Sequence, residues 1–69
     1  MTPRESFVQA AIWLKGKDDK MLCQAVIAFA DERMETAHSS AGVHAGFPCL
    51  EACKKLEREN LLQECGLRP

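Results

Sequence analysis

A ten-residue apolar run at 21–30, MLCQAVIAFA, constrains the fold of this chain more than any other stretch. Only Gln24 interrupts the run. On a helix, these residues together with Met34 and Ala37 cover an arc of roughly 200° or more, whereas a surface helix needs an apolar arc of about 100°. One neighbouring helix cannot cover so wide an arc. The sequence therefore predicts a central helix that packs on two neighbours, or on one neighbour and a second chain.

The 69 residues are enough for one domain, spanning 1–69. A chain of this size buries only about 60% of the surface that its unfolded form exposes, so its stability is marginal without a partner or a staple. Its apolar content of 46% and charged content of 28% are typical of a globular domain. We therefore expect a folded domain that gains from association.

The first predicted helix covers about 3–16. Thr2 is suited to the N-cap, and Glu5 follows at the spacing of a capping box. Gly16 is suited to end the helix. Trp13 lies off the main apolar stripe, so we expect it to be exposed in a monomer. The stripe itself consists of Phe7, Ala10, Ala11 and Leu14.

Two further helices are predicted, at about 19–38 and 48–65. Asp18 or its neighbour caps the second, Pro48 starts the third, and Gly66 ends it. Because no segment alternates apolar and polar residues over enough length, no strand is expected. The predicted fold class is all-α, a three-helix domain with a long central helix. The residues of the third helix expected to face inward or toward a partner are Leu50, Ala52, Cys53, Leu56, Leu61 and Leu62.

The net charge of −1 argues against two classes of partner. Nucleic-acid binding draws most of its affinity from basic residues that neutralise phosphates, and an anionic membrane surface also calls for a basic excess. No apolar run reaches the roughly 20 residues needed to span a bilayer. The N-terminal stretch is a poor signal peptide, because charged residues follow its short apolar part. We expect a cytoplasmic protein with reduced thiols.

Two histidines and two cysteines raise the alternative of a zinc-stapled domain. The spacing H-x5-H-x4-C-x3-C joins the end of the second helix, the loop and the start of the third helix, and four N and S ligands suit tetrahedral zinc. Cysteine on an apolar helix stripe is more commonly a small core residue, so no metal or cofactor is assigned. The four residues of the alternative are His38, His44, Cys49 and Cys53.

Catalysis and DNA recognition are two further functions that the third predicted helix could serve. Cys49 lies near the N-terminus of this helix, a position that activates a thiol. A catalytic pocket must be enclosed by surrounding structure, and three short helices can enclose little. No enzyme is therefore expected. As a DNA-recognition helix it offers Lys54, Lys55 and Arg58, yet several glutamates share the same surface and would repel phosphate. A dimeric DNA-binding regulator remains only an alternative.

The preferred hypothesis of function is based on the excess of apolar surface. Three short helices cannot easily bury all of it, and Trp and Met are enriched in protein interfaces. We expect a small non-enzymatic interaction module, a regulatory or inhibitory accessory protein, that docks an apolar helical face on itself as a homodimer or on a larger protein. The residues predicted for this interface are Trp13, Cys23, Ile27, Met34 and Leu62. Of these, Ile27 and Met34 should be less than fully buried in an isolated chain.

Overall fold

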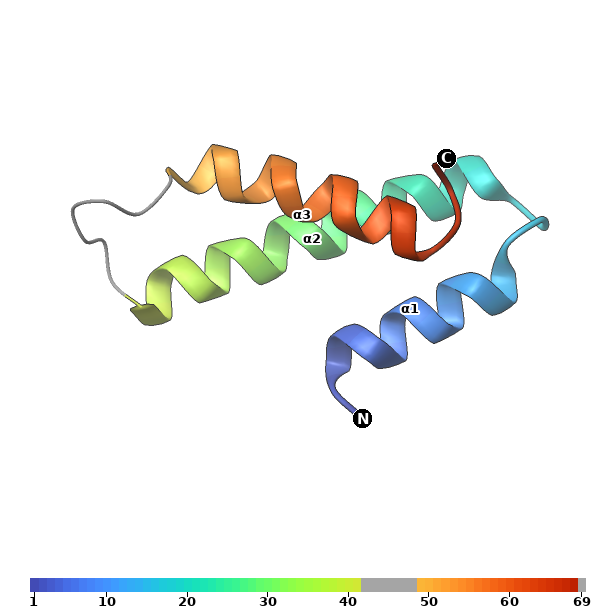
Figure 1. The fold of residues 1–69 in the computed structure, drawn as a ribbon, viewed down its shortest axis with the longest axis horizontal. Helices are drawn as coiled ribbons and strands as arrows, with labels where there is room; N and C mark the ends of the chain where they lie inside the picture. The colour runs from blue at the N-terminus through green and yellow to red at the C-terminus, as the bar shows by residue number, and fades with distance from the viewer. Residues whose placement is uncertain (42–48, 69) are drawn as a thin grey trace.

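The computed structural model describes residues 1–41 and 49–68, and these ranges form three helices without a strand (Figure 1). α1 spans Pro3–Leu14, α2 spans Asp19–Ala41 and α3 spans Leu50–Glu64. The prediction of an all-α chain with a long central helix is confirmed, since α2 is the longest at 23 residues. Within the described ranges, no helix has the length and hydropathy needed to cross a bilayer.

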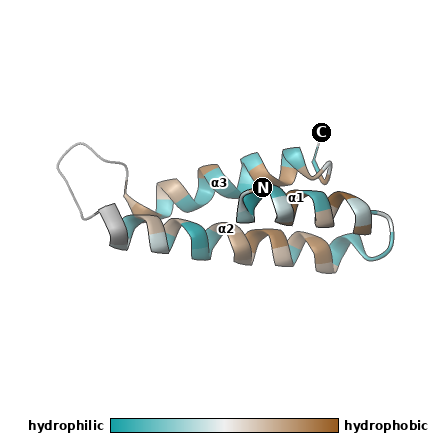
Figure 2. Cartoon of the chain, turned by 90° about the horizontal axis from the view of Figure 1, so that it is seen from below, coloured by the Kyte–Doolittle hydropathy of each residue, from teal (hydrophilic) through white to brown (hydrophobic). Residues whose placement is uncertain are grey.

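The three helices run up, down and up. α2 and α3 form an antiparallel hairpin, and α1 lies beside only the half of this hairpin that is near the link from α1 to α2 (Figures 1 and 2). The N-terminus of α1 therefore ends near the middle of α2, where Pro3 lies beside Phe29 and Arg33. The first half of α2, which contains the apolar run, is hydrophobic almost throughout in Figure 2.

The predicted N-cap of α1 is formed by Thr2. The Oγ1 atom of Thr2 accepts a hydrogen bond from the Glu5 amide at 3.1 Å, and the Thr2 hydroxyl donates to the Glu5 carboxylate at 3.1 Å. The helix ends at Leu14, two residues before the predicted end. Gly16 adopts a φ of +95°, which glycine adopts readily and other residues do not, so the chain turns there.

α2 begins where the sequence predicts and ends later. The Asp18 carboxylate accepts a hydrogen bond from the Met21 amide at 3.2 Å, so Asp18 is the N-cap. The Asp19 carboxylate in turn accepts one from the Gly16 amide at 2.7 Å, which ties the link to the start of α2. The helix continues three residues beyond 38, because nothing in the sequence before Gly42 breaks it.

α3 is slightly shorter than predicted and ends in a Schellman motif. Cys49 is its N-cap, and the predicted start at Pro48 lies outside the described residues. At the other end Gly66 adopts a φ of +74°. The Leu67 amide donates to the Leu62 carbonyl at 2.9 Å, and the Gly66 amide donates to the Gln63 carbonyl at 3.0 Å. This turn folds Leu67 back onto the core.

The fully buried core is small, and it corrects the predicted phase of α3. Leu56, expected to face inward or toward a partner, is 64% exposed, whereas Glu57 is only 8% exposed. The reason is that three buried apolar residues near the end of α3 fix which face of the helix points inward, and position 57 lies on that face. The buried apolar residues are Ala11, Val26, Ala30, Leu61, Leu62 and Cys65.

Candidate functional site

Three of the exposed large apolar side chains among the described residues flank the link between α1 and α2. Trp13 is 72% exposed, Met21 is 67% exposed and Leu14 is 42% exposed. We call these three residues the apolar corner. Leu14 and Met21 line one side of an open hollow of about 290 Å³, together with Leu22 and Ala25 of α2. The corner thus includes an exposed aromatic side chain and, at Leu14 and Met21, one side of a shallow apolar hollow.

The corner is exposed because α1 is only partly covered by the other helices. α1 buries a single residue, Ala11, although Phe7 and Val8 also pack against the core. Leu14, predicted to lie in the buried stripe, is therefore left partly in solvent. Ile12, on another face of the same turn, is 52% exposed and lines a separate hollow of about 350 Å³ that reaches Glu64 of α3.

The structure places the five predicted interface residues in three different settings. Trp13 is exposed, as expected, and the Lys17 ammonium lies 4.1 Å from its ring centroid. Cys23, Ile27 and Met34 are half-buried, which confirms that Ile27 and Met34 are not fully covered in one chain. Leu62 is 1% exposed, so a single chain already buries it and its side chain offers no surface to a partner. It packs into the core on the same inward face of α3 that buries Cys65.

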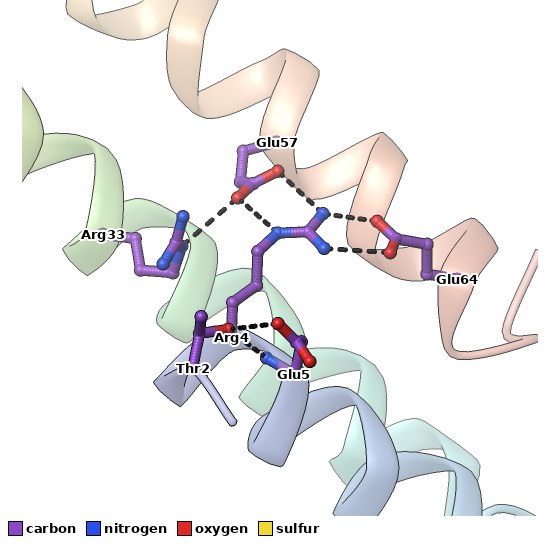
Figure 3. A network of polar contacts seen from close by, with 6 residues as sticks. All are labelled: Thr2, Arg4, Glu5, Arg33, Glu57 and Glu64. Carbon is purple, nitrogen blue, oxygen red and sulfur yellow. Dashed lines mark hydrogen bonds and ion pairs between the residues drawn. The ribbon is translucent and has the colours of Figure 1, made fainter.

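A network of four charged side chains joins all three helices (Figure 3). The Arg4 guanidinium of α1 donates to Glu57 at 3.2 and 3.3 Å and to Glu64 at 2.9 Å, with a second, shorter bond to Glu64. Arg33 of α2 donates to the same Glu57 carboxylate at 3.3 Å. The hydrogen bonds that Arg4 donates to Glu64 and Glu57 raise the pKa of Arg4 above its usual range. The network therefore satisfies the one buried carboxylate among the described residues and fastens the start of α1 to α3.

Acid should destabilise the fold through its ion-paired carboxylates. The hydrogen bond from Arg4 lowers the pKa of Glu64 below its usual 4.5, and that from Arg58 lowers the pKa of Asp31 below its usual 3.8. A carboxyl whose pKa is lower in the folded state adds stability above its unfolded pKa, and this is lost as pH falls through the folded pKa. We expect the urea midpoint to fall as pH is lowered from about 5 to about 2.

The matched control for this pH experiment is the double variant Glu64→Gln and Asp31→Asn. It has no carboxyl at either position, so its urea midpoint should fall less steeply over the same pH range than that of the natural chain. Identical pH slopes for the two proteins would contradict the assignment of these two ion pairs.

The structure brings together two of the four residues of the zinc alternative. The Nε2 atom of His38 lies 3.3 Å from the Sγ atom of Cys53, across the interface between α2 and α3. Cys49 is exposed at the N-cap of α3, and His44 lies outside the described residues. Within the described ranges, no three side chains of metal-binding type are grouped closely enough to hold an ion.

The basic residues of α3 are largely engaged with α2. Arg58 donates to both oxygens of Asp31, at 2.7 and 2.8 Å, and Lys54 pairs with Glu35 at 2.7 Å. These pairs neutralise two of the three cations that a DNA-recognition helix would present, which leaves Lys55. The observation counts against α3 as a phosphate-binding surface.

Sequence reasoning missed Met21 and Glu57 as the residues that matter most at the corner and in the network. Met21 lies in the apolar run, and nothing in the sequence distinguishes it from the rest of the apolar arc of α2. Glu57 lies in a mixed-charge stretch that resembles a solvated helix face. A helical wheel drawn from Leu61 and Cys65 alone puts Glu57 inward, and that was the available signal.

Comparison with protein-family models, with curated proteins and with solved structures finds no match to this chain.

Proposed function

We propose that this chain is a small non-enzymatic protein-interaction module that associates with a second copy of itself through the apolar corner. The observation that carries the proposal is the exposure of Trp13, at 72%. Leaving a tryptophan and a methionine of one corner in water forgoes the burial energy that large apolar side chains provide in folding and association. Both residue types are enriched at interfaces, and Trp is a frequent binding anchor.

A second copy is the simplest occupant for three reasons. A twofold interface requires only that a surface complement itself, and it is the commonest oligomeric arrangement. The net charge of −1 gives two copies little reason to repel each other. The link beside the corner also carries both signs of charge, with Lys17 and Asp18 adjacent, so two copies related by a twofold axis can pair opposite charges. A larger protein as target, with a regulatory or inhibitory effect, is the other form of the same proposal.

Truncating two side chains of the apolar corner should weaken self-association. We expect the double variant Trp13→Ala and Met21→Ala to raise the dimer dissociation constant by tenfold or more, because each truncated anchor costs about 1 kcal/mol or more at an interface. The measurement is sedimentation equilibrium across a wide range of concentration. Leu56→Ala is the matched control, since Leu56 is 64% exposed but lies on α3 away from the corner. A chain that stays monomeric at every concentration, or a dimer indifferent to both variants, would contradict the proposal.

The zinc-stapled domain is the second candidate, and the short distance between His38 and Cys53 favours it. An ion there would tie the far end of the α2–α3 hairpin, where α1 does not reach, and would stabilise a small domain by coupling binding to folding. The test is metal analysis of tag-free protein, with His38→Ala and Cys53→Ala as the variants. Protein that contains no metal, and whose melting temperature does not change with added zinc or chelator, would remove this candidate.

A further inference from the structure

We propose that α1 is an exchangeable helix, and that in the dimer the α1 of each copy docks on the α2–α3 hairpin of the other. This inference rests on the proposed self-association and names how the two copies interlock. The groove that receives α1 is an acceptor site of defined chemistry. It has an apolar floor that includes Val26 and Leu61, and an acidic end made by Glu57 and Glu64.

The α2–α3 hairpin of a second copy can make the same contacts with α1 that the chain's own hairpin makes. Arg4, the residue of α1 that forms the charged network, is near the end most distant from the link. One turn later, the rings of Phe7 and Phe29 stack with centroids 4.0 Å apart and planes at 1°. Ala11 then packs into the core. Because these contacts join α1 to α2 and α3 rather than to the link, exchange would conserve every one of them.

α1 is also held less firmly than the other two helices. Ala11 is its one buried residue, and an open hollow lined by Val8 and Ile12 lies between α1 and Glu64. Opening one chain therefore exposes little fully buried side-chain surface of α1. The charge complementarity between Arg4 and the two glutamates gives a free α1 a specific place to dock on another copy.

The link between α1 and α2 has the properties of a hinge. It is four residues long, 15–18, and Gly16 within it adopts a φ of +95°. A side chain at Gly16 would meet nothing within 4 Å, so a substitution there acts on the backbone angle and causes no clash. The folded link is held by the hydrogen bond from the Gly16 amide to Asp19 as well as by this angle. In the exchanged dimer the two links run past each other, and the exposed Trp13, Leu14 and Met21 on either side of each link can pack between the copies. Such packing would cover the three exposed apolar residues that flank the link.

The test is to mix isotopically labelled and unlabelled chains, allow the dimers to re-form, and record an isotope-filtered NOE spectrum. In an exchanged dimer the contact between Phe7 and Phe29 joins two chains, so it should appear in the filtered spectrum. A dimer in which this contact stays within one chain would overturn the exchange while leaving the proposed function intact. Absence of any dimer would overturn both.

The hinge variant Gly16→Ala provides an independent measurement. The left-handed backbone costs a non-glycine residue about 1–2 kcal/mol, so the variant should disfavour the closed chain by roughly tenfold per hinge and raise the dimer fraction. Lys20→Ala is the control, because Lys20 is an exposed residue of the first turn of α2 whose backbone is helical. A Gly16→Ala chain that associates less than the natural chain would contradict the exchange.

Discussion

Leu61→Ala should lower the free energy of unfolding by about 3 kcal/mol, whereas Leu56→Ala in the same helix should change it by less than about 0.5 kcal/mol. Leu61 is 0% exposed and Leu56 is 64% exposed. The truncation at Leu61 removes buried contacts and leaves a cavity, while the truncation at Leu56 removes a side chain that is mostly in water. Urea unfolding followed by circular dichroism measures both values.

The pair of leucine variants tests the phase of α3. With a domain of this size, a loss of about 3 kcal/mol is a large part of the total stability, so the Leu61 variant should be partly unfolded near body temperature. Equal losses for the two variants, or a larger loss at Leu56, would mean that the face of α3 that points inward is assigned wrongly.

Glu57→Ala should lower the free energy of unfolding by about 2 kcal/mol. The substitution leaves Arg33 without its carboxylate partner and leaves Arg4 with Glu64 alone. Removing one partner from a buried ion pair costs about 3–5 kcal/mol, and the loss here should be smaller because both arginines reach solvent. Urea unfolding measures the loss.

The control for Glu57→Ala is Glu51→Ala. Glu51 lies in the same helix with its side chain 78% exposed, and it contacts Lys54 only at 3.7 Å. Such a surface pair contributes little, so Glu51→Ala should change stability by less than about 0.5 kcal/mol. If Glu57→Ala were equally neutral, the network at Arg4 would not be what holds α1 in place, and the acidic end of the acceptor groove would lose its assigned role.

The features that sequence predicted well are those that depend on near neighbours in the chain. The N-caps at Thr2 and Asp18 and the turn at Gly16 need only residues three or four positions away, and each is found as predicted. The exposure of Trp13 followed from the same local argument, because it lies off the stripe that contains Phe7 and Ala11.

The features that sequence did not predict depend on how far one helix overlaps another. Leu62 was predicted for an interface and Leu56 for an inward or partner-facing position. The inward face of α3 carries Leu62 and Glu57, and Leu56 is exposed. A buried glutamate becomes acceptable only when Arg4, 53 positions earlier in the chain, reaches it. No periodicity within α3 contains that information.

Trp13 fluorescence over a dilution series is the most direct measurement of the central claim, that two copies associate through the apolar corner. Trp13 is the only tryptophan of the chain, so its emission reports on this corner alone. The account predicts that emission is blue-shifted at high concentration, where a second copy covers the ring, and moves to the red on dilution as the ring becomes exposed. A solvent-exposed emission spectrum that is the same at every concentration would contradict it.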